Sequence, residues 1–282
     1  MKKILSFVIV IAITIAFIPS CDIVEEPYLL PVGANDTTGP GENVRKVLVE
    51  DFTGQKCPNC PEAAEIAHTI KTLYGEQIVI LTVHAGFYAV PDLNGNFTTE
   101  FRTPEGDELN AFFGFPAYPM GMVNRTDYSG STILLKDSWE AASAIQVELD
   151  AQAEITISNT YNAGTHKLDC ILETEFLEDL DGTYNICAFI VESGIISPQQ
   201  SEGGVIPAYE HNHVLRTSMN GTWGDLVGTD GLAVSGNKLT NSYSITLPPV
   251  WDAENCAVVA FIYNTETLEV LQAEERVLVA GQ

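Results

Sequence analysis

The stretch Cys57-Pro58-Asn59-Cys60 holds the residues of this chain best suited to chemistry. It follows a β-rich run and precedes residues with helical periodicity, so we expect Cys57 at a helix N-terminus and Cys60 one turn inside. Pro58 suits the first helical position, where a missing N–H costs nothing. The positive end of the helix dipole favours a thiolate and lowers the pKa of a cysteine below about 8.5. Cys57 is the predicted attacking sulfur, and Cys60 the resolving one.

Two other interpretations of the cysteine pair compete with redox chemistry. A structural zinc ion needs four ligands, and no second CxxC or CxxH follows, so no metal site is expected. A purely structural disulfide in an inactive domain is harder to exclude and stays open. Neither interpretation requires a cofactor, and none is predicted.

The elements that must position the pair follow from apolar periodicity. A buried strand is predicted around Val47–Phe52, and a second one at Gln77–His84. Between them, apolar residues at helical spacing predict a helix that ends near Gly75. Residues 86–112 exceed a simple connection and indicate an insertion, with a helix over Glu105–Phe112. An amphipathic helix is expected over Asp137–Leu149.

The segment from Val49 to Cys57 resembles the thioredoxin strand that leads into the active site. This resemblance implies that Asp51 is a buried acid assisting proton transfer at the resolving cysteine. Phe113–Pro119 resembles the thioredoxin stretch that ends in a cis-proline. It implies a cis Tyr118–Pro119 bond lying against the cysteine pair, with Pro116 as the competing candidate.

The expected substrate groove beside the pair includes Lys56, Tyr118 and Phe87. Lys56 stands where thioredoxins commonly carry Trp, and it adds a cationic neighbour to Cys57. Four aromatic residues of the insertion could line this groove or fill a satellite core, and we favour the core: Phe87, Tyr88, Phe97 and Phe101.

Helical periodicity disappears beyond Asp150, and short apolar runs separated by turn residues predict six or more strands. We therefore expect a β-sandwich. Buried, free thiols are the favoured interpretation of Cys170, Cys187 and Cys256, with a Cys170–Cys187 bridge as the alternative. His211 and His213 would share one face of a strand, where they could hold a metal, but a hydrogen-bonded pair is favoured.

The N-terminus reads as an export signal. Lys2-Lys3 precede the apolar run Ile4–Ile18, which ends in Ile18-Pro19-Ser20-Cys21 and resembles a bacterial lipobox with Cys21 as the lipidated residue. The apolar run is short for a transmembrane helix, which needs about 20 residues. Four segments result: a signal peptide at 1–20, a tether at 21–43, a thioredoxin-like α/β domain at 44–150 and an all-β sandwich at 151–282.

The net charge of −25 makes nucleic acid an unlikely partner, because an acidic protein repels phosphate backbones. The lipobox, the segment Glu50–Pro61, Val123-Asn124-Arg125 and His211–Arg216 resemble one family, the outer membrane protein 28-related lipoproteins of Bacteroidetes-type bacteria. The resemblance implies an outer-membrane lipoprotein, anchored through Cys21, on the periplasmic face or the cell surface.

Two functional hypotheses follow. The first is a thiol–disulfide oxidoreductase that acts on thiols or disulfides of exported proteins with an envelope redox partner, using Cys57, Cys60, Asp51 and Pro119. The second is a non-catalytic adhesion or scaffold lipoprotein in which the cysteine pair is a permanent disulfide. A Cys57 sulfur walled off from solvent favours the second.

Overall fold

The computed structural model describes residues 44–278, which lie within one compact unit. The predicted signal peptide, Cys21 and the tether fall outside the described residues. No helix within 44–278 is long and apolar enough to span a membrane.

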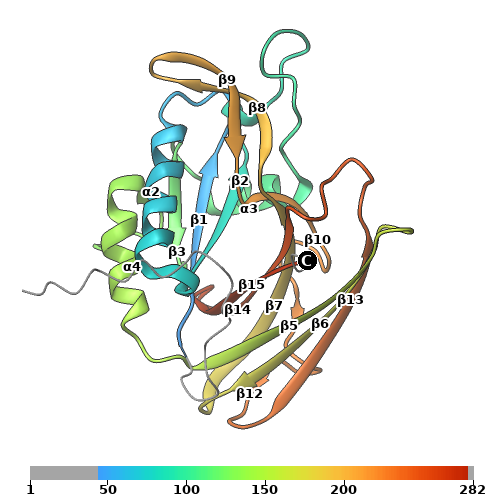
Figure 1. Cartoon of the computed structure of the whole chain (residues 1–282). Coiled ribbons are helices and arrows are strands. Elements are labelled where there is room, and N and C mark those ends of the chain that lie inside the picture. The colour runs from blue at the N-terminus through green and yellow to red at the C-terminus, as the bar shows by residue number, and fades with distance from the viewer. Residues whose placement is uncertain (1–43, 279–282) are drawn as a thin grey trace, which may run out of the picture. The chain divides into compact units, whose positions relative to one another are not determined.

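The first part of the described chain alternates strands and helices (Figure 1). Single 3₁₀ turns lie at Gly75–Gln77, Phe87–Ala89 and Lys136–Ser138. The longer elements, with the two-residue strand β4, are β1 (Val47–Thr53), α2 (Cys60–Tyr74), β2 (Ile78–His84), α3 (Pro104–Phe113), β3 (Met120–Val123), β4 (Leu134–Leu135) and α4 (Trp139–Val147).

The second part consists of strands, as the loss of helical periodicity predicts. Its elements are β5 (Ala153–Asn162), β6 (Lys167–Phe176), β7 (Leu180–Glu192), β8 (Ile195–Ser201), β9 (Gly204–His211), β10 (Val214–Ser218), β11 (Asp225–Leu226), β12 (Leu232–Ala233), β13 (Lys238–Thr246), β14 (Cys256–Asn264) and β15 (Val270–Val277).

One large mixed sheet runs through both parts. Its hydrogen-bonded order is β15-β14-β7-β10-β2-β1-β3-β4, and β11 and β12 also pair with β7. Strands β1 and β2 are parallel, and β3 is antiparallel to β1. The two parts meet where β10 pairs with β2 in parallel through Val214 and Thr82. The expected α/β thioredoxin-like domain followed by an all-β sandwich is therefore wrong.

The physical reason lies in the central strands. Ile186–Glu192 of β7 and Cys256–Tyr263 of β14 are buried at successive residues. A strand buried on both faces must be covered on both faces and occupies the interior of a sheet. Such strands extend the sheet begun by β1, β2 and β3 and do not form a separate sandwich with a solvated outer face.

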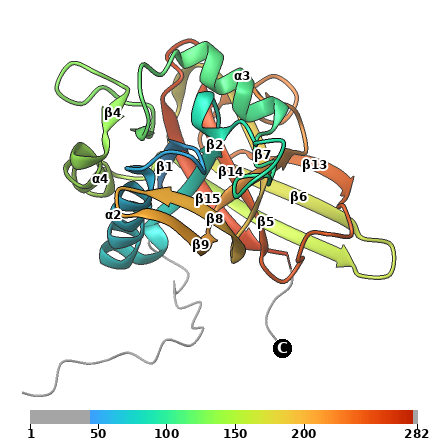
Figure 2. The same cartoon turned by 90° about the horizontal axis from the view of Figure 1, so that it is seen from above.

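Three cores stabilise the two faces of this sheet (Figures 1 and 2). Helices α2 and α4 cover the face of β1 and β2, where Ala63, Ile70 and Trp139 pack on Val49 and Ile80. A smaller sheet, of order β13-β6-β5, packs its apolar side on β7 and β14. The third core includes Leu109 of α3 and lies among residues of β1, β2, β7 and β14.

Helix α3 confirms the helix expected in the insertion. Thr103 caps it, because its Oγ accepts a hydrogen bond from the Gly106 N–H at 3.0 Å, and Pro104 opens its first turn. Gly114 ends it in the left-handed region at φ 68°, a conformation that glycine adopts without a Cβ penalty.

The beginning of β1 is fastened to β15, the last strand. The Lys46 N–H donates to Gln272 Oε1 at 2.6 Å, and Gln272 Nε2 donates to the Val44 carbonyl at 3.0 Å. The Lys46 ammonium also pairs with Glu274 at 2.6 Å. We refer to these contacts as the terminal clasp. These contacts join residues more than 220 positions apart and hold the residues before β1 against the last strand.

Candidate functional site

Cys57 and Cys60 form a disulfide, as their spacing predicts. The helix that follows begins later than expected, at Cys60, so Cys57 precedes it and Pro61, not Pro58, occupies the opening turn. Cys57 is completely buried, and Cys60 is buried with 3% of its surface exposed. The helix N-terminus therefore lies at the second cysteine of the pair.

The β8–β9 hairpin covers the disulfide. Its two strands form a separate small sheet that stands above β1 and α2 in Figure 1. Gln199 of β8 is buried, and its Nε2 donates to the Cys57 carbonyl at 3.0 Å and to the Gly54 carbonyl at 3.3 Å. The Gln200 N–H donates to the Gln55 carbonyl at 2.8 Å. These bonds hold the hairpin against the loop that carries Cys57.

Asp51 lies in the middle of β1, paired with Thr82 of β2 and Gly121 of β3. Its side chain is 1% exposed, and Oδ1 has no hydrogen-bond partner. Burial raises the pKa of Asp51 to about 7, because the charged carboxylate loses its hydration. At neutral pH the Asp51 side chain is therefore present in comparable amounts as the carboxylic acid and as the carboxylate.

A cavity of about 640 Å³ lies between α2, β1, β2 and β9. Asp51 and Cys60 line it together, and Tyr209, His211 and His213 line it from the hairpin side. This volume falls within the range of small-molecule sites, about 300–1,000 Å³. Two of the predicted catalytic residues, Asp51 and Cys60, therefore line the same cavity.

Two histidines and an aromatic ring form a buried cluster beside this cavity. The rings of His84 and Phe101 stack at 4.6 Å, and Phe101 lies 4.6 Å from His211. Burial lowers the pKa of His211 to about 4 although a backbone hydrogen bond with Ser197 raises it. Burial also lowers the pKa of His84, with further lowering from His211 and Arg216. Both rings are neutral at pH 7.

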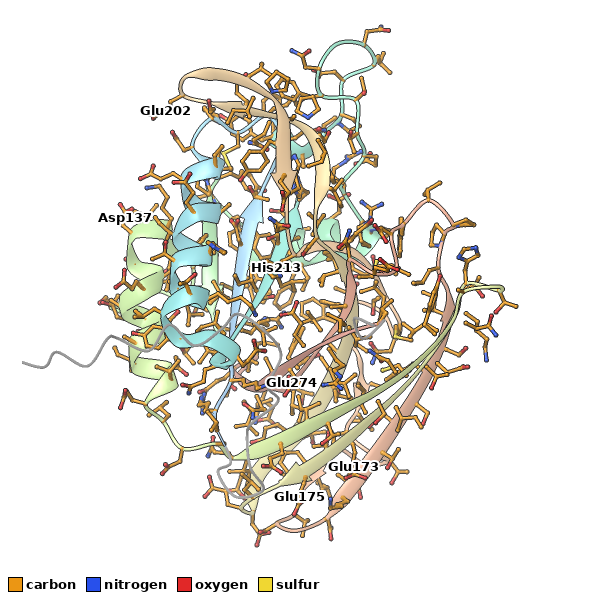
Figure 3. All side chains as sticks on the ribbon, viewed as in Figure 1. Asp137, Glu173, Glu175, Glu202, His213 and Glu274 are labelled. Carbon is orange, nitrogen blue, oxygen red and sulfur yellow. A yellow bond between two sulfur atoms is a disulfide. The ribbon has the colours of Figure 1, made fainter. Side chains whose placement is uncertain are left out.

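His211 and His213 do not lie on one strand face. His211 ends β9, and His213 follows in the left-handed region at φ 55°, which breaks the alternation of a strand. His213 lies near the centre of the view in Figure 3, with its Nδ1 3.5 Å from Glu275 Oε1. Within residues 44–278, no cluster of three or more His, Cys, Asp or Glu side chains could hold a metal ion.

The predicted groove residues lie apart from the cavity. The Tyr118–Pro119 bond is cis, as predicted, and the Tyr118 hydroxyl donates to Asn110 Oδ1. The Lys56 ammonium pairs with Asp92 at 3.0 Å and lies 5.7 Å from the centre of the Phe87 ring. Phe87 is 77% exposed, so the core interpretation holds for Phe101 but not for Phe87. None of Lys56, Phe87, Tyr118 and Pro119 lines the cavity.

The other three described cysteines are buried and free, which confirms the favoured interpretation over a Cys170–Cys187 bridge. Burial raises the pKa of Cys170 to about 11 and the pKa of Cys187 and Cys256 to about 12. Thiols with such pKa values hold almost no thiolate at pH 7 and are poor nucleophiles.

Sequence reasoning missed a buried ion pair on the other face of β1, at the residue before Asp51. Arg125 Nε and Nη2 donate to the two oxygens of Glu50, both at 2.8 Å, and the two side chains are 1% and 0% exposed. The Arg125 guanidinium also lies 5.1 Å from the centre of the Phe261 ring. An acid inside the apolar run of β1 is the one sequence signal that indicates such a partner. Gln199, which covers Cys57, gives no comparable signal.

The fold and the site define a protein with one large mixed sheet and a disulfide enclosed beneath a β-hairpin. A family model described as Outer membrane protein Omp28 matches residues 106–281, and the chain belongs to that family. Cys57 and Cys60 precede the matched residues. A search of curated proteins finds no match.

Solved structures resemble the chain at low identity. HBP35 of Porphyromonas gingivalis is 19% identical, with a TM-score of 0.64 over 86% of this chain and 80% of that one. A protein from Agrobacterium tumefaciens is 15% identical, with a TM-score of 0.51 over 86% and 98%. A domain of the outer membrane lipoprotein Omp28 from Porphyromonas gingivalis is 22% identical, with a TM-score of 0.31 over 44% and 86%. The likeness to HBP35 spans both parts of the chain, in line with the correction of the expected fold.

Proposed function

We propose that this protein is an adhesion or scaffold lipoprotein of the outer membrane, with Cys57–Cys60 as a structural disulfide. The observation that carries the proposal is the complete burial of Cys57 beneath Gln199 and the β8–β9 hairpin. Thiol–disulfide exchange requires a thiolate to reach a sulfur atom, and a covered sulfur resists that attack. The family description, outer membrane protein, supports the location.

Exposed apolar side chains support a role in contacting other molecules. Phe87 and Leu93, in the segment between β2 and α3, are 77% and 98% exposed, and Ile196 of β8 is 61% exposed. This segment and the hairpin project from the same end of the molecule in Figure 1. Exposed apolar side chains of this kind are candidate contact points for a partner molecule.

The redox properties of the disulfide test the structural role. We expect a reduction potential below about −300 mV, the range of structural disulfides, when the full chain is equilibrated with dithiothreitol buffers and thiols are counted after alkylation. Closing so short a loop contributes about 2 kcal/mol, so the Cys57→Ala/Cys60→Ala variant should fold with a modest loss of stability. A potential near that of thioredoxin, together with reduction of insulin, would overturn the structural role.

Anchoring through Cys21 is tested separately. Lipid chains on the cysteine of a lipobox bind membranes through buried CH₂ groups, each worth about 0.8 kcal/mol. We expect Cys21→Ser to move the protein from the membrane fraction to the soluble fraction, whereas Cys170→Ser should leave it in the membrane. A Cys21→Ser variant that stays in the outer membrane would contradict anchoring by lipid.

A second candidate function is thiol–disulfide oxidoreduction of exported proteins. Asp51 favours it, since an acid with a pKa of about 7 shares a cavity with Cys60 and could accept or return its proton. In this reaction a substrate thiolate attacks Cys57 Sγ, the Cys57–Cys60 bond breaks, and Cys60 leaves as a thiolate that takes up a proton. A second thiol of the substrate then attacks the mixed disulfide, so the substrate leaves as a disulfide and the two electrons remain on Cys57 and Cys60 as a dithiol. The hairpin must move aside for the attack, and an envelope partner must regenerate the pair.

Trapping distinguishes the two functions. If exchange occurs, Cys60→Ser accumulates mixed disulfides with exported proteins on Cys57, visible as bands that dithiothreitol removes. The matched variant Cys57→Ser/Cys60→Ser shows none. Absence of such bands in the Cys60→Ser variant would support the structural disulfide and end the oxidoreductase hypothesis.

A further inference from the structure

The cavity beneath the hairpin is lined by ionisable side chains, and of these the proposed functions use only Asp51. The ionisable side chains that line it are Asp51, Glu65, Glu210, His68, His84, His211, His213 and Tyr209, and no Lys or Arg is among the lining residues. Arg216 lies close enough to lower the pKa of His84, but it pairs with Glu192 at 3.3 Å and lies 5.0 Å from the centre of the Trp251 ring. The field inside the cavity is therefore suited to a cation and repels an anion.

Three buried side chains in this lining have polar atoms without a partner. They are Asp51 Oδ1, His84 Nδ1 and His211 Nε2, and the residues are between 1% and 4% exposed. A buried polar atom left without a hydrogen bond costs about 1–3 kcal/mol, so three in one lining are expected to meet a ligand or water.

The hydrogen bond between His211 and the Ser197 backbone indicates which kind of partner the other ring nitrogen, Nε2, requires. A bond with the Ser197 backbone raises the pKa of His211, which means that the ring donates to the carbonyl oxygen. Because Nε2 has no partner, we assign this bond to Nδ1 and the proton of the neutral ring with it. The neutral ring then leaves a lone pair on Nε2. His211 Nε2 and an ionised Asp51 are both acceptors that require an N–H or O–H donor.

We infer that this cavity binds an organic cation, a protonated primary amine on a short apolar chain. An ammonium group has three N–H donors and no acceptor, which matches Asp51, His211 and the Nε2-protonated form of His84. Tyr209 adds an aromatic ring to the lining, a group that attracts cations, and Ala64, Ala67 and Ile80 line the space for the alkyl chain. The inference goes beyond the scaffold function and does not depend on it.

Calorimetric titration of the full chain with n-hexylamine tests the inference. We expect one equivalent to bind, and 1-hexanol and hexanoate, which match its length, to bind at least tenfold more weakly. Asp51→Asn should weaken the binding of hexylamine at least tenfold. Glu202→Gln should not change it, since Glu202 is at the tip of the hairpin in Figure 3 and does not line the cavity. Equal binding of hexanol, or undiminished binding by Asp51→Asn, would overturn the inference.

The pH dependence gives a second readout on the same protein. The ionisable groups that face Asp51 are Glu65 and His68 of α2, His84 of β2, and Tyr209, Glu210 and His211 of β9, with His213 just beyond. Since the amine requires ionised Asp51, binding at pH 6 should release about one proton, and affinity should fall about tenfold per pH unit below 7. Binding without proton release would contradict Asp51 as the counter-ion.

The amine could belong to a free metabolite or to a lysine side chain of a partner. A peptide with one internal lysine, compared with its Nε-acetylated form, distinguishes these sources. Displacement of hexylamine by the lysine peptide alone indicates a protein ligand. If only hexylamine binds, the ligand is a small amine. If neither compound binds, the cavity holds only water and the inference is wrong.

Discussion

Replacing Arg125 with alanine is expected to lower the free energy of unfolding by about 3–5 kcal/mol, the cost of breaking a buried ion pair. The change leaves the Glu50 carboxylate buried at 0% exposure without either of its two hydrogen bonds at 2.8 Å. It also removes a cation that lies between 5.1 and 5.6 Å from the ring centres of Phe113, Phe261 and Tyr263. These rings come from α3 and β14, so the loss weakens the packing of both elements against Arg125.

Urea unfolding of the variant measures this effect as a shift of the midpoint at an unchanged slope. The matched control is Arg102→Ala, which breaks a pair with Glu100 on the surface, with side chains 31% and 48% exposed. Exposed pairs contribute about 0–1 kcal/mol, so the control should unfold close to the wild type. A double change of Glu50→Leu and Arg125→Met should cost less than Arg125→Ala, because no unpaired charge remains. Equal decreases in the free energy of unfolding for Arg125→Ala and Arg102→Ala would show that the Glu50 carboxylate is not left buried without a partner.

Replacing Asp51 with asparagine is expected to stabilise the protein at pH 8 and to change little at pH 4. In the unfolded chain this carboxyl loses its proton near pH 3.9, but in the folded protein its pKa is about 7. Between these values the folded state holds a proton that the unfolded state has released, so stability falls as pH rises and levels off above pH 7. Three pKa units correspond to about 4 kcal/mol, which asparagine avoids because it carries no charge.

Unfolding curves at pH 4, 5, 6, 7 and 8 would show this difference growing with pH. Asp137→Asn is the control, since the Asp137 side chain is 77% exposed and lies on the surface near α4 in Figure 3. Its stability should follow that of the wild type at every pH. An Asp51→Asn variant that is less stable than the wild type at pH 8 would mean that the Asp51 carboxylate is well solvated in the folded protein.

Local structure could be predicted from sequence because it depends on local pattern. The buried run of β1, the helix after Cys60 and α3 are where apolar spacing and Gly or Pro signals indicate them. Beyond Asp150 the six long strands β5, β6, β7, β13, β14 and β15 agree with the expectation of six or more strands. The disulfide and the cis Tyr118–Pro119 bond followed from short motifs.

The sheet order could not be predicted, because the apolar pattern of a strand does not determine which other strand pairs with it. A single parallel pair, Val214 with Thr82, joins the two parts of the large sheet across more than 130 residues. The β8–β9 hairpin was also missed, since Pro198 and Pro207 interrupt its apolar pattern and favour a loop interpretation. Without that hairpin, neither the burial of Cys57 nor the β9 wall of the cavity has a sequence signal. The first of these features supports the scaffold function.

The terminal clasp has a consequence for how the chain reaches its folded state. Of the described strands, β1 is synthesised first, but Gln272 and Glu274, which contact Lys46 just before it, belong to the last strand. A partly synthesised chain therefore lacks the clasp partners of the residues that lead into β1. Contacts between such distant residues raise the contact order and slow folding, because a long loop must close before the contacts are gained. We expect the clasp to form only after β15 has been synthesised, so the residues before β1 stay unfastened while the chain can still be threaded through a translocation channel.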